Sequence, residues 1–361
     1  MRGMRKPGRA RYAGRTPLWL SLAATVLSLA LGVAACGSGS SATSATSATS
    51  ADATATATAT TPTTAAASPA DVPIPDGVTT MPESPAPPLT GCDASLRPTG
   101  PLPAAGAMPA GSTMAKIQQR GYLIAGVDED SYLFGYRNPS ADPSAPPLVG
   151  FDIDFVQQVA TAIFGAPGHV RYKVLTKAER LTALHQGSVD LLADILTVDC
   201  QRAQQADFSA DYFDAGQRVL VNQASTVQGI GGLAGKKVCA AAGTTSIQTL
   251  ADPKYRVLPI SAVNWADCLV MLQQGQVDAI STTDLILLGI QSQDPYTKIV
   301  GPPFTYERHG LGFPKGKGDF IRFVNAVLEQ MKANGTWTAI YTHWIGDRLG
   351  PVPAPPPAVY Q

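Results

Sequence analysis

The chain has 361 residues, of which 45% are hydrophobic and 15% are charged, so it can bury at least one full core and has room for two. Its 27 Lys and Arg residues equal its 27 Asp and Glu residues, which gives a formal net charge of zero. The sequence contains neither a basic stripe nor basic residues interleaved with aromatic ones, which excludes nucleic-acid binding as the class of function.

The first 35 residues are typical of an export signal. Residues 1–17 contain six basic residues and no acid, and residues 18–31 form an uncharged apolar run. That run is short for a membrane span, and small residues follow it directly before Cys36. This pattern predicts cleavage before Cys36 and lipidation of its sulfur, which would anchor the protein on the extracytoplasmic face of the cell membrane. An ordinary cleavage site with an incidental cysteine is the alternative.

Low-complexity segments are expected on both sides of the folded part. Residues 36–112 begin with Ser, Ala and Thr near-repeats such as SATSATSATS and TATATAT, which offer too little apolar surface to order themselves. We therefore predict a flexible stalk over residues 36–112. The proline-rich residues 347–361 predict an extended tail.

Strand and helix patterns alternate between the stalk and the tail. The first set reads YLIAGV, FDIDFVQQVATAIF, VRYKVL, ERLTALHQG and VDLLADIL, and the second reads KKVCAAAG, TSIQTLA, RVLPI, WADCLVMLQQG and VDAIST. Such alternation predicts parallel βαβ units in two doubly wound α/β lobes. The chain then returns to the first lobe through GLGFPKG and a closing helix that ends at Gly335.

We expect lobe 1 to contain residues 113–216 and 307–346, and lobe 2 to contain residues 217–306. Two crossings between the lobes would form a hinge, and a cleft between hinged lobes is a common place for a small ligand.

Four cysteines remain after Cys36, and an even count in an exported chain favours two disulfides with three possible connectivities. We favour Cys239 with Cys268, because the strand and the helix that carry them can pack face to face. Cys92 with Cys200 then follows by elimination. No Cys or His spacing is typical of a metal site, so we expect no metal.

The segment GFDIDFVQQVATAI, residues 150–163, resembles position by position the signature of bacterial extracellular solute-binding protein family 3. Further pieces follow in the family's order, including ERLTALHQGSVDLL, LTVDCQRAQQADFS, GKKVCAAAGTTS and NGTWTAIYTHWIG. The likeness covers about residues 116–346 and is strongest to actinobacterial glutamine-, glutamate- and aspartate-binding lipoproteins. It implies a two-lobed periplasmic-binding-protein type II fold, and a monomer that delivers an amino-acid-like ligand to an ABC permease without cofactor or covalent chemistry.

The resemblance also implies where the ligand would bind. In such proteins an arginine holds the α-carboxylate, and here that arginine is Arg202, with the strand-end hydroxyl of Thr197 beside it. The amides of Thr244 and Thr245 would meet the same group from lobe 2. Asp128 would contact the ligand's amino group or side chain. The aromatic residues that follow it could line the pocket, although alternation in a strand is more often a sign of core; they are Tyr132, Phe134 and Tyr136.

Several positions depart from the family's pattern. Asp199 stands where Thr or Ser is usual, and Thr283 stands where the family has an aspartate for the α-ammonium, with the acid one place later as Asp284. Asp194 replaces the lysine of relatives that bind acidic amino acids. Lys177 replaces an aromatic lid, and Ile195 replaces a smaller residue.

Two interpretations of these departures stay open. In the first, Asp128, Asp194 and Asp199 make the cleft anionic and favour a cationic or zwitterionic ligand. In the second, Asp199 caps the helix that begins at Cys200, where an aspartate is intrinsically favourable.

Two other functions remain alternatives to transport. The protein could be an amino-acid sensor that signals to a membrane receptor, or a dehydratase-type enzyme on the same fold. The sequence has no G-x-S-x-G, no H-E-x-x-H and no complete P-loop, so we expect no enzyme.

Overall fold

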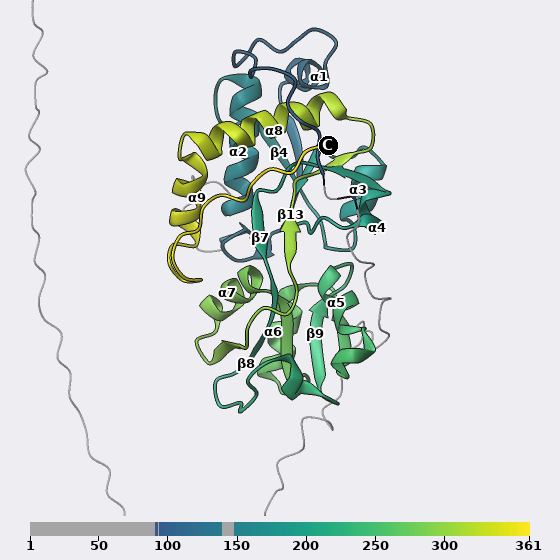
Figure 1. The fold of residues 1–361 in the computed structure, drawn as a ribbon, viewed down its shortest axis with the longest axis vertical. Coiled ribbons are helices and arrows are strands. Elements are labelled where there is room, and N and C mark those ends of the chain that lie inside the picture. The colour runs from purple at the N-terminus through teal and green to yellow at the C-terminus, as the bar shows by residue number, and fades with distance from the viewer. Residues whose placement is uncertain (1–90, 93, 139–147) are drawn as a thin grey trace, which may run out of the picture. The chain divides into compact units, whose positions relative to one another are not determined.

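The computed structural model describes residues 91–92, 94–138 and 148–361 (Figure 1). The expected signal segment, Cys36 and the repetitive part of the stalk lie outside the described residues. Within them the main strands form two five-stranded sheets, each flanked by helices, which we call lobe 1 and lobe 2. The protein therefore has the predicted two-lobed type II fold.

The sheet of lobe 1 has the strand order β4-β1-β5-β14-β6. β1 (Leu123–Val127) pairs in parallel with β4 (Val170–Val174) and β5 (Leu191–Ala193), so helices must connect these strands. β14 (Gly312–Pro314) belongs to the returning chain and pairs antiparallel with β5 and with β6 (Ala206–Phe208). The first sheet thus contains strands from both ends of the folded part.

The helices of lobe 1 cover this sheet with apolar faces. In α8 (Gly318–Ala333) buried residues recur three and four positions apart, at Phe320, Phe323, Val324, Val327, Leu328 and Met331. Gly335 follows with a φ of 83°, so the backbone turns there into the next helix. The other helices are α1 (Thr113–Arg120), α2 (Phe151–Phe164), α3 (Arg180–His185), α4 (Cys200–Ala203) and α9 (Thr336–Trp344).

The sheet of lobe 2 has the order β10-β9-β11-β8-β12. β9 (Lys237–Ala241) pairs in parallel with β10 (Leu258–Ala262) and β11 (Ala279–Thr283). β8 (Gln217–Asn222) pairs antiparallel with β11 and with β12 (Thr297–Val300). The helical elements are α5 (Thr245–Leu250), α6 (Trp265–Gln273), α7 (Asp284–Gln293), and the 3-10 turns η2 (Ile230–Leu233) and η3 (Pro253–Tyr255).

Helix α7 was not predicted from the sequence. Its residues from Leu285 to Ile290 are all buried, so the apolar positions form no stripe of helical period that a sequence pattern could reveal. Two very short strands near the start of lobe 1 were also missed, β2 (Asp130–Ser131) and β3 (Gly135–Tyr136).

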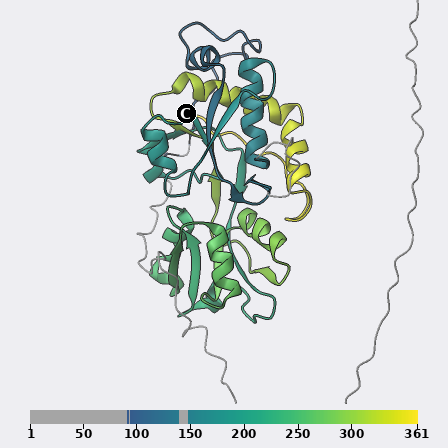
Figure 2. The same cartoon turned by 180° about the vertical axis from the view of Figure 1, so that it is seen from behind.

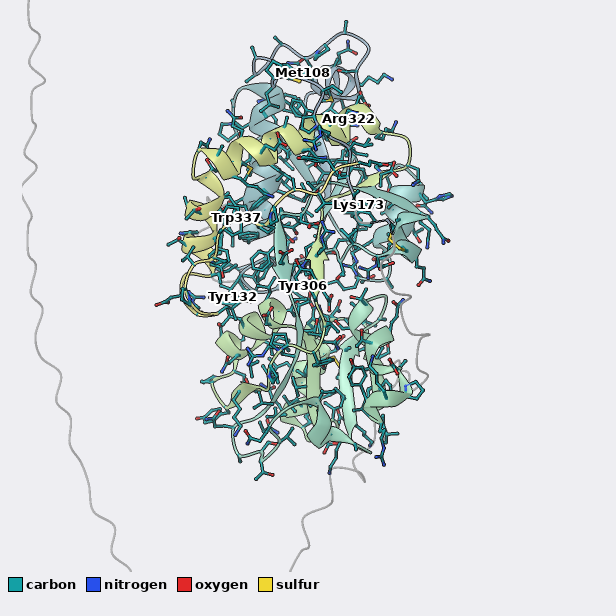
Figure 3. All side chains as sticks on the ribbon, viewed as in Figure 1. Met108, Tyr132, Lys173, Tyr306, Arg322 and Trp337 are labelled. Atoms are coloured by element: carbon teal, nitrogen blue, oxygen red, sulfur yellow. A yellow bond between two sulfur atoms is a disulfide. The ribbon has the colours of Figure 1, made fainter. Side chains whose placement is uncertain are left out.

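A separate strand pair connects the two sheets. β7 (Phe213–Ala215) precedes the first strand of lobe 2, and β13 (Glu307–His309) follows the last, and the two pair antiparallel. Both views show these strands side by side where the chain passes between the sheets (Figures 1 and 2). The exposed Tyr306 lies beside this pair and donates its hydroxyl to Asp214 of β7 at 2.9 Å (Figure 3).

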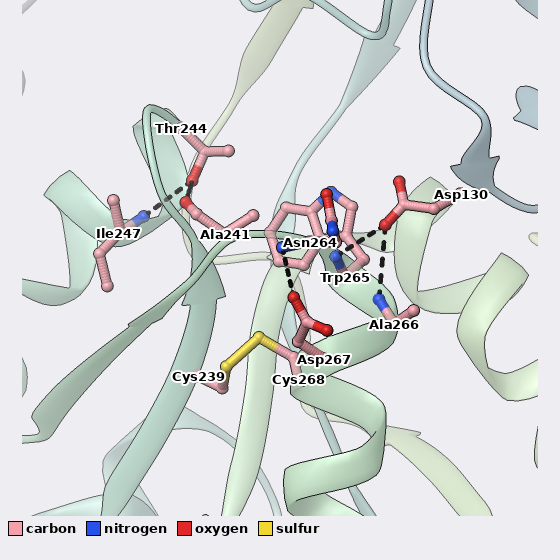
Figure 4. The surroundings of a disulfide bond; sticks show 10 residues. All are labelled: Asp130, Cys239, Ala241, Thr244, Ile247, Asn264, Trp265, Ala266, Asp267 and Cys268. Carbon is pink, nitrogen blue, oxygen red and sulfur yellow. Dashed lines mark hydrogen bonds between the residues drawn. A yellow bond between two sulfur atoms is a disulfide. The ribbon is translucent and has the colours of Figure 1, made fainter. Parts of the chain in front are cut away.

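Both predicted disulfides are confirmed. Cys239 of β9 is bonded to Cys268 of α6 inside lobe 2 (Figure 4), and Cys92 is bonded to Cys200 at the start of α4. The first bridge closes a sequence separation of 29 residues and the second one of 108. The second bridge ties the end of the expected stalk to lobe 1.

The folded part begins earlier and ends later than expected. Residues 94–112 were expected to belong to the stalk, yet Met108 is buried in the core, and buried Ser95 donates its hydroxyl to the Phe208 carbonyl at 2.7 Å. The tail pairs with this segment through Ser95 and Tyr360. Scattered apolar residues and backbone pairing order both segments, and neither leaves a periodic pattern in the sequence.

Candidate functional site

A small cavity of about 20 Å³ lies where the two lobes meet the crossing strands. It is enclosed by side chains of three kinds: cations, hydroxyls with one carboxylate, and apolar groups. These are Lys177, Arg180 and Arg202; Thr197, Thr244, Thr245, Ser246, Thr282, Thr283 and Glu307; Ile195, Trp265 and Ile286. Such a volume holds about one water molecule, so an amino acid would enter only after the lobes or these side chains move.

Arg202 is the predicted carboxylate anchor, and its guanidinium is buried where the lobes meet. One nitrogen donates to the carbonyl of Thr197 at 2.8 Å, and another donates to the carbonyl of Gly243 in lobe 2 at 3.2 Å. Burial lowers the pKa of Arg202 to about 10, and the nearby charge of Arg180 acts in the same direction. The arginine thus joins both lobes at the cavity.

Arg180 is a second buried arginine that the sequence reasoning did not single out. It donates to the carbonyls of Lys177 at 2.9 Å, Asp194 at 3.0 Å and Gly243 at 3.2 Å. Gly243 has a φ of 71°, and a Cβ there would lie 2.7 Å from the Cα of Ala178. Glycine is therefore required at 243 for the backbones of the two lobes to approach this closely.

Asp199 caps helix α4, as the second interpretation of the sequence proposed. Its carboxylate accepts from the backbone amide of Arg202 at 2.8 Å and lies 3.3 Å from that residue's Nε. Its charge is therefore balanced by the arginine whose helix it caps.

Asp128 and Asp194 do not make the cleft anionic, because Lys177 lies between them. The ammonium of Lys177 is 2.5 Å from the carboxylate of Asp128 and also pairs with that of Asp194, to which Arg180 is 3.8 Å distant. Burial alone would lower the pKa of Lys177, but the two aspartates raise it above its usual value. The first interpretation, of an anionic cleft, is corrected accordingly. Lys177 lies 49 positions from Asp128 and 17 positions from Asp194, and nothing in the local sequence indicated this cluster.

Three other predicted ligand contacts lie outside the cavity. Phe134 is 1% exposed and packs against Phe151 and Phe213, so it belongs to the core of lobe 1. Tyr132 is half-buried and packs edge-on against Tyr136, with 4.9 Å between ring centroids. Asp284 begins α7 and borders a different cavity beside α9.

The strand end that carries Ile195 and Thr197 is held by Asp152. Its carboxylate accepts from the amide of Ile195 at 2.8 Å and from the hydroxyl of Tyr212 at 2.7 Å, and burial raises its pKa to about 7. Ile195 has a φ of 42°, which is strained for a β-branched residue. The Asp of the GFDID segment thus fixes a strained turn at the cavity wall.

Lobe 2 supplies most of the hydroxyls around the cavity. Thr244 caps α5, accepting from the amide of Ile247 at 3.3 Å and donating to the carbonyl of Ala241 at 2.6 Å (Figure 4). The hydroxyl of Thr283 and the indole nitrogen of Trp265 are buried and have no hydrogen-bond partner among the described residues. Unpaired buried polar atoms are costly, so their presence in the cavity lining indicates a polar ligand.

Asp130 makes a further contact between the lobes. Its carboxylate accepts from the backbone amides of Trp265 at 3.0 Å and Ala266 at 3.5 Å, at the first turn of α6 (Figure 4). Burial and the neighbouring Asp128 raise its pKa to about 8. This residue was not predicted, because its partner lies 135 positions away.

Glu307 is the one carboxylate among the residues that line the cavity. It lies on the crossing strand β13, is 5% exposed, and accepts hydrogen bonds from the hydroxyls of Thr197 at 2.8 Å, Thr245 at 3.1 Å and Thr305 at 3.0 Å. Sequence reasoning did not identify it, because it lies 110 positions from Thr197.

Neither a metal-binding cluster nor a membrane-spanning helix occurs in the described part of the chain. No group of three or more His, Cys, Asp or Glu residues there could hold a metal ion. None of its helices combines the length and apolarity needed to cross a membrane.

The chain is similar in sequence and fold to known solute-binding proteins. The sequence model for "Bacterial extracellular solute-binding proteins, family 3" matches residues 123–347. The ABC transporter glutamine-binding protein of Bacillus subtilis (strain 168) is 33% identical over 234 residues, which cover 64% of this chain and 84% of that protein. A solved ancestral arginine-binding protein bound to glutamine has a TM-score of 0.58 and 32% identity, covering 63% of this chain and 99% of that chain. A solved ancestral amino acid-binding protein, described as a precursor of cyclohexadienyl dehydratase, has a TM-score of 0.58 and 28% identity, covering 64% and 99%.

Proposed function

Because the chain belongs to the bacterial extracellular solute-binding proteins, family 3, we propose that it captures an amino acid between its lobes and delivers it to an ABC permease. The observation that carries this proposal is the position of Arg202. Its buried guanidinium reaches both the strand end at Thr197 and the Gly243 carbonyl of lobe 2. A carboxylate that displaced these carbonyls would gain two charge-assisted hydrogen bonds and would touch both lobes.

The relatives support an amino acid as the ligand, since the Bacillus subtilis protein is named for glutamine binding and an ancestral protein was solved with glutamine bound. The cavity lining supports a zwitterion, because it combines cations, one carboxylate and unpaired hydroxyl and indole groups. Contacts to both lobes would shift the hinge toward a closed state, as a population shift and not a reaction.

We also propose that the protein acts outside the cytoplasm, held at the cell membrane by a lipid on Cys36. The support is the sequence pattern of residues 1–36, since these lie outside the described part of the structure. A membrane receptor in place of a permease would use the same capture step. Pull-down of the lipidated protein from membranes, with and without ligand, separates these partners.

The test is isothermal titration of the purified protein with the common amino acids, repeated with Arg202→Ala. We expect wild-type protein to bind at least one amino acid, and the variant to lose about 100-fold or more in affinity, because it leaves a buried carboxylate without its cation. Arg218→Ala is the matched control. Its Nε donates to the Gly301 carbonyl at 2.8 Å inside lobe 2, so binding should persist.

Two outcomes would contradict the proposal. Equal affinity of wild type and Arg202→Ala for an amino acid would remove Arg202 as the anchor. Recovery of a dehydrated or decarboxylated product after incubation with prephenate or arogenate would favour an enzyme, whereas we expect every bound compound to be released unchanged.

A further inference from the structure

Glu307 is a buried acid whose hydrogen-bond partners among the described residues are all neutral hydroxyls. Its carboxylate is 5% exposed and forms no ion pair with any described residue, and its three hydrogen bonds all come from threonine hydroxyls. A buried carboxylate is stable only when a cation or several donors compensate its charge. Hydroxyls supply part of that compensation, and a cation would supply the rest.

The other acidic side chains near the cavity differ from Glu307 in this respect. Asp128 and Asp194 share the ammonium of Lys177, and Asp199 pairs with Arg202. None of these three is among the residues that line the cavity. Among these four acids, Glu307 is therefore the one that lines the cavity and makes no ion pair.

Glu307 gives the lining of the cavity charges of both signs. The lining contains three cations, Lys177, Arg180 and Arg202, and a single carboxylate at Glu307. Any ligand that presented only a carboxylate would meet the cations favourably but would be repelled by Glu307. A ligand that carries an ammonium group beside its carboxylate would satisfy both sides, since a carboxylate with four acceptor positions can take an ammonium in addition to three hydroxyls.

We propose that Glu307 is the acceptor for the ligand's ammonium group and that it selects α-amino acids over carboxylic acids without an amine. This proposal rests on the proposed function, because it assumes that an amino acid binds in this cavity. The position of Glu307 on β13 also places the proposed ammonium contact where the chain crosses between the lobes. Since β13 pairs with β7 where the chain crosses between the lobes, an ammonium held there lies against the hinge itself.

A substitution at Thr283 can test whether the charge of a carboxylate, and not the shape of the Glu307 side chain, determines binding. Thr283 lines the same cavity and is 3% exposed, and its hydroxyl has no hydrogen-bond partner among the described residues. An aspartate at 283 would therefore bring a second carboxylate to the cavity from lobe 2.

The experiment measures the affinity of the purified protein for L-glutamine and L-glutamate and for their deamino analogues, glutaramate and glutarate. Glu307→Gln keeps the shape and the hydrogen-bond acceptor but removes the charge. We expect it to bind the two amino acids about 10- to 100-fold more weakly and the deamino analogues equally or more tightly. Adding Thr283→Asp to this variant should restore at least part of the affinity for the amino acids and none for the analogues.

Glu179→Gln is the matched control. Glu179 also accepts from a threonine hydroxyl, that of Thr176 at 2.8 Å, but it is exposed and lies outside the cavity lining. Its variant should bind like wild type, and the far-ultraviolet circular dichroism of every variant should match that of wild type.

Three results would overturn the proposal. If Glu307→Gln bound amino acids and analogues more tightly by the same factor, Glu307 would be an internal substitute for the ligand's carboxylate. If Asp284→Asn lost affinity and Glu307→Gln did not, the acid one residue after Thr283 would be the acceptor. Unchanged amino-acid affinity in Glu307→Gln would rule it out directly. In each case wild-type protein still binds an amino acid, whereas absence of any amino-acid binding by wild type means that the proposed function itself has failed.

Discussion

At the scale of single residues, the cleft contains ion pairs between residues that lie far apart in the sequence. Lys177 departs from the family's aromatic lid, and Asp194 departs from the lysine of relatives that bind acidic amino acids. The structure shows that these two positions compensate each other, because the ammonium of Lys177 lies at the carboxylates of Asp194 and Asp128. Two apparently unrelated departures from the family's pattern thus form one ion pair.

Removal of this lysine should destabilise the fold strongly. Lys177→Met would leave the buried Asp128 without its cation and Asp194 with only the more distant Arg180, so we expect the free energy of unfolding to fall by about 3–5 kcal/mol. For a protein of this size the melting temperature should then drop by roughly 6–20 °C. Differential scanning calorimetry measures this directly.

Lys173→Met is the control for the loss of a lysine nearby. Lys173 is exposed and donates to the hydroxyl of Ser188 at 2.9 Å (Figure 3), so its removal should change the free energy of unfolding by no more than about 0.5 kcal/mol. Similar melting temperatures for the two variants would show that Lys177 is not the counter-ion of the buried aspartates.

At the scale of elements, two residues of the crossing strand β13, Glu307 and His309, have different environments. Glu307 faces the cavity, and His309 is 0% exposed and bonds through its carbonyl to the amide of Tyr212 at 3.0 Å. Burial lowers the pKa of His309 to about 3, with Arg202 and Arg180 acting in the same direction. The imidazole is therefore neutral in the folded protein at any ordinary pH.

Because His309 is buried in its neutral form, we predict that the folded protein loses stability in acid. In the unfolded chain this histidine takes up a proton below its usual pKa of about 6.5, whereas the folded protein resists this until about pH 3, so protons favour unfolding between these values. Denaturant unfolding at pH 7, 6 and 5 should show wild type losing up to about 1.4 kcal/mol per pH unit more than His309→Gln. Parallel pH profiles of the two proteins would contradict the assignment.

At the scale of the whole described molecule, the two ends of the folded part are tied together on lobe 1. The amide of Ser95 donates to the Val359 carbonyl at 2.9 Å, and the amide of Gln361 donates to the Ser95 carbonyl at 3.0 Å. Lys332 of α8 donates to the Pro356 carbonyl at 2.6 Å. The proline-rich tail is thus part of the fold, and the C-terminus lies against lobe 1 (Figure 1).

Deletion of residues 351–361 should therefore lower the free energy of unfolding by about 3 kcal/mol, since three hydrogen bonds of about 1 kcal/mol each are lost. Urea unfolding measures it. Val352→Ser changes an exposed tail residue and should have an effect within about 0.5 kcal/mol. A deletion that unfolds like the full chain would mean that the tail adds nothing to stability.

The sequence by itself determined the features that depend on local pattern. Alternating strands and helices gave the two α/β lobes, the cysteine count and the packing of a strand on a helix gave both disulfides, and the segment around Thr197 and Arg202 placed two residues that line the cavity. The lobes and the segment around Thr197 and Arg202 are legible because they arise from short segments or from patterns that repeat with the period of a helix or strand. The pairing of Cys92 with Cys200, 108 positions apart, followed by elimination from the even cysteine count.

Only the tertiary structure decided which charges the cleft presents. Lys177 lies 49 positions from Asp128, and Glu307 lies 110 positions from Thr197, so no local pattern could show that the lysine pairs with two aspartates and that the glutamate is bonded to threonine hydroxyls. Electrostatic compensation depends on distance in space and on burial, and both are set by how the lobes and crossing strands pack. Family and fold therefore followed from the sequence, while the charge pattern that would select a ligand did not.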